Sequence, residues 1–289
     1  MTIIQGILLG MLQGVAEFLP ISSSGHLKLC QALFGLEEVP VLFDVFLHLA
    51  TLVAVCLYFR KKIWNLLKIF GRWIARKPQP EVTTPDDMIS GTDAYGRKAI
   101  IALIISTVIT GALGVFTSKV ISDIPLKAVC AGFICTSILL ILSGQAEKHP
   151  RRRKNASTSQ PVDISPKPVS IFQSVVVGIM QGLGTLPGIS RSGSTIAGSL
   201  FAGMDRKTAG DYSFIVSIPA ILGAFILELK DLGQVNEVIG AAPVIAGCAA
   251  AFAVGYISLT YLMKLIKKGK IVWFAAYLIP VGILGILFF

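Results

Sequence analysis

Two polar segments with nearly the same sequence constrain this chain most, because each interrupts a stretch that is otherwise apolar. The first, at residues 10–26, reads GMLQGVAEFLPISSSGH, and the second, at residues 178–194, reads GIMQGLGTLPGISRSGS. They align without a gap, so that Ser23 corresponds to Arg191 and Glu17 to Thr185. We interpret the two segments as an internal repeat whose copies contribute different residues to one site.

The composition is that of an integral membrane protein. Only 15% of the 289 residues are charged and 54% are hydrophobic, whereas a soluble domain carries about 25% charged residues. Six apolar runs are predicted to span a membrane. They cover residues 43–59, 99–116, 128–142, 211–229, 238–263 and 271–289.

The net charge of +10 comes mainly from three segments, so it indicates topology rather than nucleic-acid binding. Residues 60–98, 148–167 and 264–270 hold 19 of the 26 Lys and Arg residues. Excess positive charge marks the cytoplasmic side of a membrane protein. We therefore expect these three segments in the cytoplasm, with an interfacial amphipathic helix at 63–74 and loops at 76–96 and 144–170.

Each polar segment is expected to break an apolar stretch into two half-helices. The first broken hairpin covers 3–36 and the second 171–204. Three full spans lie between them, and an odd number inverts the second copy. We predict an all-α polytopic membrane protein with six transmembrane helices and two re-entrant hairpins in an inverted-topology repeat. It is a single domain, with repeat one at 1–143, a cytoplasmic loop at 144–170 and repeat two at 171–289.

The residue types at the hairpin tips are typical of an anion site. Serine and glycine precede the second half-helix of each hairpin, where free backbone N–H groups and the helix dipole favour a negative charge. Arg191 adds a forked cationic donor suited to phosphate. The candidate phosphate-binding residues are Ser22, Ser24, Ser190, Arg191, Ser192 and Thr195.

Glu17, Ser23 and His26 supply hydrolytic roles beside this anion site. Ser23 is a candidate nucleophile with Glu17 or His26 as its base, or His26 attacks directly or protonates a leaving group. A carboxylate beside a phosphate repels it unless a cation bridges them. We therefore expect Mg²⁺ or Ca²⁺, held by Glu17 and Gln13.

Asp44 and His48, in the sequence FDVFLH, are candidates for a secondary role.

The sequence resembles the undecaprenyl-diphosphatase family, which is associated with bacitracin resistance. The resemblance rests on QGVAEFLPISSSGH near the N-terminus, FDVFLHLATL in the first span, and LPGISRSGSTI with DYSFIVSIPA in the second half. It implies hydrolysis of undecaprenyl diphosphate to undecaprenyl phosphate and inorganic phosphate, which recycles the lipid carrier for peptidoglycan synthesis. It also implies a divalent cation and a site reached from the outer face of the bacterial cytoplasmic membrane.

The family's motif residues fall on positions already selected. Its serine and histidine correspond to Ser23 and His26, and its arginine motif to Ser190, Arg191, Ser192 and Thr195. Its first acidic motif has Glu or Gln, then three residues, then Glu, and here it reads Gln13 and Glu17. Where two glutamates would offer two carboxylates to the metal, this chain offers one.

A transporter or flippase of a polyprenyl phosphate or another anionic substrate is the alternative, because inverted repeats with broken helices are typical of transporters. The asymmetry between the two tips favours an enzyme, since a symmetric carrier has little need of different residues on each tip. The expected partners are a polyprenyl diphosphate lipid and the membrane, with no nucleic acid. The sequence is also compatible with a homodimer.

Overall fold

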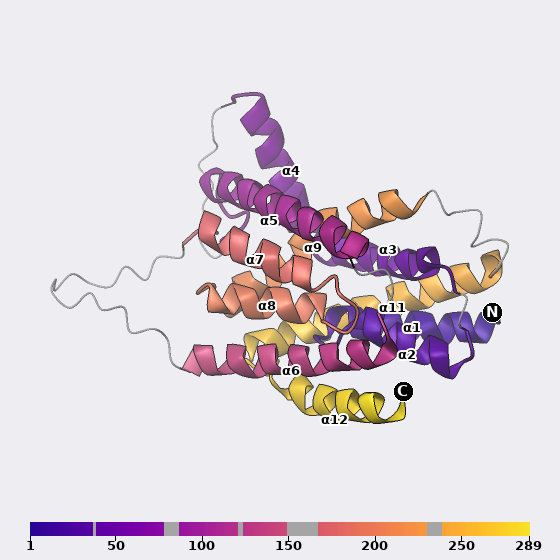
Figure 1. Ribbon diagram of the computed structural model, residues 1–289. Helices are drawn as coiled ribbons and strands as arrows, with labels where there is room; N and C mark the ends of the chain where they lie inside the picture. Colours follow the sequence, from indigo (N-terminus) through magenta and orange to yellow (C-terminus); the bar gives the residue numbers. More distant parts are fainter. Residues whose placement is uncertain (37–38, 78–86, 121–123, 149–166, 230–238) are drawn as a thin grey trace.

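The computed structural model describes residues 1–36, 39–77, 87–120, 124–148, 167–229 and 239–289. This part of the chain is all-helical, as predicted, with 11 helices and no strand. In chain order the helices are α1 (Ile3–Phe18), α2 (Ser23–Leu33), α3 (Val41–Tyr58), α4 (Arg60–Ile74), α5 (Asp93–Val120), α6 (Leu126–Lys148), α7 (Ile171–Leu183), α8 (Arg191–Phe201), α9 (Arg206–Glu228), α11 (Ala241–Lys267) and α12 (Trp273–Phe288). Figure 1 shows most of them bundled along a common direction, with α4 projecting from one side.

The duplicated segments form two helical hairpins, α1–α2 and α7–α8. Both hairpins begin with the same capping box, in which Thr2 pairs with Gln5 and Ser170 with Gln173. In each box the hydroxyl of the first residue accepts a hydrogen bond from the backbone N–H of the glutamine. The glutamine side chain in turn accepts one from the backbone N–H of the first residue. Both broken stretches therefore fold into two short helices, as the sequence predicted.

The turns of the two hairpins meet inside the bundle. Helix α1 starts near the marked N-terminus, and α7 starts at the opposite end (Figure 1). Both run inward until the chain breaks. There the Ser192 hydroxyl donates to the backbone oxygen of Leu19 at 3.4 Å. Residues 19–22 and 184–190 therefore form adjacent turns.

Each hairpin packs mainly on a long helix from the other half of the sequence, α1 on α11 and α7 on α5. Glycines allow this close approach. A Cβ on Gly10 would lie 2.1 Å from the backbone oxygen of Gly247, and one on Gly178 would lie 2.9 Å from the Cα of Ser106. The two halves of the chain are thus interlocked.

Five helices are long and apolar enough to cross a membrane: α3, α5, α6, α9 and α11. They correspond to the first five predicted spans. The predicted sixth span, 271–289, forms α12, which has 16 residues and contains Pro280. At about 1.5 Å per residue it is shorter than the roughly 30 Å of a bilayer core.

Two predicted loops and the basic segment 264–270 are partly helical. Helix α5 already begins at Asp93, inside the predicted loop 76–96, because the Thr92 hydroxyl accepts from the N–H of Tyr95 at 3.1 Å. Helix α6 extends into the predicted loop 144–170, and α11 extends to Lys267. These extensions contain good helix formers and no proline. Residues 230–237, between the fourth and fifth predicted spans, lie outside the described residues.

Helix α4 has the amphipathic character predicted for 63–74. Its outward face carries exposed apolar side chains, which are Trp64, Leu67, Phe70 and Ile74. Lys62 fixes the start of the helix by ion pairs to Asp87 at 3.0 Å and Asp211 at 2.6 Å. Burial alone lowers the pKa of Lys62, but the negative charges of Asp211 and Asp87 outweigh burial and raise it above its usual range.

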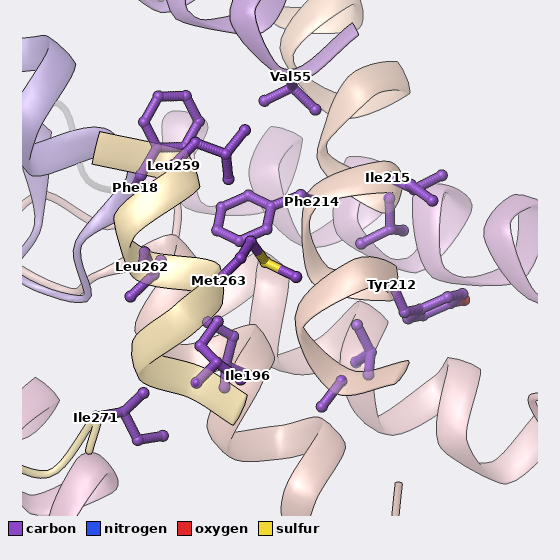
Figure 2. Packing of buried hydrophobic residues seen from close by; sticks show 14 of the residues in the cluster. Phe18, Val55, Ile196, Tyr212, Phe214, Ile215, Leu259, Leu262, Met263 and Ile271 are labelled. Carbon is purple, nitrogen blue, oxygen red and sulfur yellow. The ribbon is translucent and has the colours of Figure 1, made fainter. Parts of the chain in front are cut away.

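A buried apolar cluster lies beside the turns and joins α1, α8, α9 and α11 (Figure 2). Phe18 and Phe214 pack with ring centroids 5.8 Å apart, and both are fully buried. Ile196 and Leu259 are fully buried in the same cluster. The last turn of α1 is therefore held by packing, which fixes the position of the neighbouring Glu17.

Candidate active site

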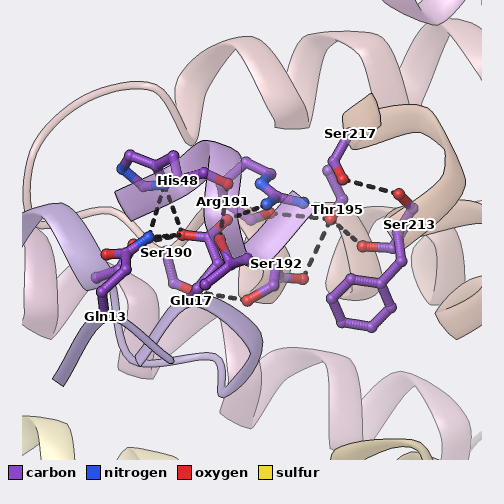
Figure 3. A network of polar contacts seen from close by, with 12 residues as sticks. Gln13, Glu17, His48, Ser190, Arg191, Ser192, Thr195, Ser213 and Ser217 are labelled. Carbon is purple, nitrogen blue, oxygen red and sulfur yellow. Dashed lines mark hydrogen bonds and ion pairs between the residues drawn. The ribbon is translucent and has the colours of Figure 1, made fainter. Parts of the chain in front are cut away.

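Glu17, near the end of α1, is the centre of a buried polar cluster (Figure 3). Its Oε2 accepts a hydrogen bond from Ser23 Oγ at 2.7 Å and another from Gln13 Nε2 at 3.0 Å. The same oxygen lies 2.9 Å from Nδ1 of His48. Its Oε1 is paired with the guanidinium of Arg191. A carboxylate buried this deeply requires such donors, since an unpaired buried charge is costly.

Local structure explains how these residues meet. Gln13 and Glu17 lie four residues apart on α1 and so share one face of the helix. Ser23 and Arg191 are the first residues of α2 and α8, and the two turns bring both helix starts to the end of α1. The aligned residues Ser23 and Arg191 thus contact the same carboxylate, one on each oxygen. That they share a phosphate stays a prediction.

The starts of α2 and α8 are capped in the same way. Ser22 accepts from the N–H of Gly25 at 3.4 Å, and Ser190 accepts from the N–H of Gly193 at 3.1 Å. Ser22 has a φ of 70°, in the left-handed region that non-glycine residues rarely adopt. Two helix N-termini therefore lie at the cluster, as an anion site requires.

Two polar atoms of the cluster are buried without a hydrogen-bond partner in the described part of the chain. They are Nη1 of Arg191, a donor, and Oε1 of Gln13, an acceptor. Buried polar groups are nearly always hydrogen-bonded, so each unpaired one calls for an explanation. A bound anion would satisfy the arginine, and a cation or a water molecule would satisfy the amide oxygen.

The predicted phosphate-binding hydroxyls take different positions. Ser190 and Ser192 lie with their Oγ atoms 3.3 Å apart at the start of α8. Ser24 is half-buried on the first turn of α2. Thr195 is fully buried and turned towards α9, where its hydroxyl contacts that of Ser213 (Figure 3). Thr195 therefore braces α8 against α9 in this structure.

His26 and Asp44 lie apart from the cluster. His26 Nδ1 is 2.9 Å from the backbone oxygen of Ser22, and its Nε2 is 2.9 Å from the hydroxyl of Tyr277. Asp44 accepts from Gln31 at 2.8 Å. Within the described residues, neither one forms a hydrogen bond to Glu17, Ser23 or Arg191.

The BacA family profile, described as "Bacitracin resistance protein BacA", matches residues 6–284. The match takes in both hairpins and all of the cluster. This chain belongs to the BacA family. The resemblance noted in the sequence motifs is thereby confirmed.

Relatives similar to this BacA-family chain align along nearly its whole length. An undecaprenyl-diphosphatase of Treponema denticola is 45% identical over 98% of this chain and 96% of the relative. One of Methanosphaera stadtmanae is 36% identical over 99% and 97%, and one of Borrelia recurrentis is 34% identical over 96% of each.

The cluster offers few protein ligands to a metal. The described residues contain no group of three or more His, Cys, Asp or Glu side chains that could hold one. Glu17 supplies a carboxylate, and Gln13 supplies its unpaired amide oxygen. Mg²⁺ commonly takes one or two carboxylates and completes its shell with water and substrate phosphate. The residues present fit a cation of that kind bound together with a diphosphate.

Two contacts near the site involve His48 and Tyr277. His48, the candidate for a secondary role, contacts Glu17, whereas Tyr277 was not a candidate from the sequence. In the sequence, His48 is a titratable residue inside an apolar span, and such a residue indicates a functional site. Tyr277 lies in the last apolar helix, where tyrosine is common and no motif surrounds it. Its contact with His26 depends on how α12 packs, and this could not be predicted from the sequence.

Proposed function

We propose that this chain is an undecaprenyl-diphosphatase, which hydrolyses undecaprenyl diphosphate to undecaprenyl phosphate and inorganic phosphate. The reaction regenerates the lipid carrier for peptidoglycan synthesis and, in this family, is associated with resistance to bacitracin. The observation that carries the proposal is the arrangement around Glu17. A serine hydroxyl donates to a carboxylate that is paired, on its other oxygen, with an arginine.

The proposed topology is an inverted repeat of 1–143 and 171–289 in the bacterial cytoplasmic membrane. The hairpins 3–36 and 171–204 enter from opposite sides, which agrees with the opposite starts of α1 and α7 (Figure 1). Helix α12 acts as the sixth span. Because it is short, it lies along the membrane normal and the bilayer thins around it. The basic segments face the cytoplasm and the site opens to the outer face.

The substrate's diphosphate lies between the starts of α2 and α8. Arg191 binds it through Nη1, which has no other partner in the described residues, and through Nη2 once that group leaves Glu17. Ser22, Ser24, Ser190 and Ser192 provide hydroxyl and backbone donors at the two helix starts. The prenyl tail lies between helices in the bilayer.

Exchange of Arg191 from Glu17 to phosphate has a chemical consequence. Without substrate, the guanidinium stabilises the Glu17 carboxylate and makes it a weak base. When the phosphate takes over Arg191, Oε1 of Glu17 is released, while Oε2 keeps its hydrogen bond from Ser23. Substrate binding therefore frees one carboxylate oxygen and leaves the other in place to accept the Ser23 proton.

In the chemical step, Ser23 Oγ attacks the terminal phosphorus and its proton passes to Glu17. The bond between that phosphorus and the bridging oxygen breaks, and undecaprenyl phosphate leaves with the proton returned by Glu17. Water then attacks the phosphoseryl group, with Glu17 as its base. Phosphate departs and Ser23 regains a proton. We favour Ser23 over His26 as the nucleophile because Ser23 donates a hydrogen bond to the Glu17 carboxylate and His26 does not. Both nitrogens of His26 have other partners.

A divalent cation, Mg²⁺ or Ca²⁺, would be held by Glu17 and Gln13 Oε1 together with phosphate oxygens. When bound, it neutralises charge on the diphosphate and makes the phosphorus easier to attack.

Phosphate release in detergent tests the proposed function, because a transporter has no activity without a membrane barrier. The purified protein, given undecaprenyl diphosphate and Mg²⁺ or Ca²⁺, should release one phosphate per substrate. An Arg191→Ala variant should lose most of this activity. Absence of release from the wild-type protein under both metals would favour the transporter instead.

A further inference from the structure

His26 lies in a well-defined environment outside the Glu17 cluster. It is 6% exposed, and its ring contacts two aromatic rings. Phe133 of α6 lies at a centroid distance of 4.7 Å, and Tyr277 of α12 stacks on it at 5.7 Å with an angle of 16° between the planes. The last helix of the chain therefore reaches the start of α2.

The hydrogen bonds determine which nitrogen of His26 carries the proton. A backbone carbonyl only accepts, so Nδ1, at 2.9 Å from the oxygen of Ser22, must carry hydrogen and donate it. In the neutral ring Nε2 is then an acceptor, and the Tyr277 hydroxyl donates to it at 2.9 Å. The Ser22 carbonyl thus selects the tautomer of His26, and the Tyr277 hydroxyl supports that tautomer by donating to Nε2.

The hydrogen bond from His26 stabilises the backbone of Ser22. Its φ of 70° is strained for a residue with a Cβ, and such strain persists only when neighbouring contacts enforce it. The Ser22 carbonyl accepts from the Nδ1 of His26 and also from the His26 backbone N–H at 3.2 Å. The next residue is Ser23, whose hydroxyl is aimed at Glu17.

We propose that Tyr277 is a positioning residue for the phosphatase reaction, acting through His26 on the Ser22–Ser23 turn. The Tyr277 hydroxyl orients the imidazole, the imidazole fixes the Ser22 carbonyl, and the turn presents Ser23 to Glu17. His26 then acts as a brace and does not touch the phosphate. This inference rests on the proposed function for its kinetic consequence, while the hydrogen bond itself is independent of it.

The kinetic test is Tyr277→Phe, which removes only the hydroxyl and keeps the stacked ring. We expect kcat for phosphate release to fall about three- to tenfold, as the loss of one buried hydrogen bond predicts, with KM within about twofold. The matched control is Tyr261→Phe on α11, because the Tyr261 side chain is 58% exposed. It should leave both constants unchanged. An equal loss in both variants, or none in Tyr277→Phe, would overturn the proposal.

A double-mutant cycle tests whether Tyr277 acts through His26. In a His26→Gln background, Tyr277→Phe should cause no further loss of kcat. A full, independent loss in that background would contradict the proposed route through the imidazole.

A spectroscopic readout separates this inference from the proposed function. The chain has three histidines, so ¹⁵N-histidine labelling gives few signals, and His26→Gln and His149→Gln variants assign them. The wild-type His26 should show a protonated Nδ1 and a hydrogen-bonded, unprotonated Nε2. Tyr277→Phe should shift the Nε2 signal, and an unmoved signal would refute the bond. Failure of the wild type to release phosphate would instead refute the function and leave this readout valid.

Discussion

In the proposed mechanism, Glu17 anchors its neighbours before substrate binds and serves as a base afterwards. In the structure, its two oxygens contact Ser23, Gln13, His48 and Arg191. Phosphate competes for Arg191 alone among these partners. Changes at Ser23 should therefore affect the chemical step, and changes at Arg191 should affect both binding and chemistry.

Ser23→Ala should lower kcat by about three orders of magnitude or more, because the attacking oxygen is lost, and change KM by less than about threefold. The comparison is Ser143→Ala, which removes a buried hydroxyl that donates to the Leu140 carbonyl of the same helix, α6. That control should keep normal kinetics. A nearly normal rate in Ser23→Ala would transfer the nucleophilic role to His26.

Chelation should abolish activity, and added Mg²⁺ or Ca²⁺ should restore it, because the diphosphate and Glu17 otherwise repel each other. Gln13→Glu offers the cation a second carboxylate, so half-maximal activation should require less metal. Titration of activity against free Mg²⁺ measures this. Full activity in EDTA would remove the cation from the mechanism, and an unchanged midpoint in Gln13→Glu would exclude Gln13 as a ligand.

At the scale of helices, the hairpins depend on close contact with helices from the other half of the chain. Gly10 shows this most clearly, since its backbone touches that of Gly247 with no space for a side chain. The contact places the end of α1, and hence Glu17, at the turns. A substitution at Gly10, far from the reacting groups, should therefore alter the rate of the reaction.

Gly10→Ala should lower the apparent Tm and the rate together, because overpacking typically costs about 1–3 kcal/mol and shifts α1 away from α11. Gly111→Ala on α5 is the control, because a Cβ there meets no atom within 4 Å. It should leave activity unchanged and raise stability by about 0.5–1 kcal/mol through helix propensity. Similar Tm values for the two variants would contradict the packing argument.

The sequence predicted the hairpins well and some helix ends poorly, for identifiable reasons. Proline and serine at the duplicated turns leave few alternatives to a break. By contrast, the polar residues at 144–148 suit either a loop or a solvated helix end, and tertiary context selected the helix. Likewise the sequence selected His26 for a catalytic role and His48 for a secondary one, but it did not predict the contacts of either ring. Only the packing of α3 and α12 brings His48 to Glu17 and His26 to Tyr277.

For the whole molecule, the proposed inverted repeat predicts that both termini lie outside the cytoplasm. Fusion of alkaline phosphatase after Phe289 should give active enzyme, and fusion of green fluorescent protein there should give no fluorescence, since it does not fold after export. The same reporters inserted in the basic loop at 151–154 should behave in the opposite way. Fluorescence at the C-terminus would show that α12 does not complete a sixth crossing.

In the proposed mechanism, two hairpin turns form one phosphate site, with Ser23 attacking and Arg191 binding. The most direct measurement is a structure of the wild-type protein with a methylene-bridged diphosphonate analogue of undecaprenyl diphosphate. We predict that Arg191 has left Glu17 for the terminal phosphonate, and that Ser23 Oγ lies about 3–3.5 Å from its phosphorus, in line with the bridge. A ring nitrogen of His26 in that position, or Arg191 still paired with Glu17 beside a bound phosphonate, would contradict it.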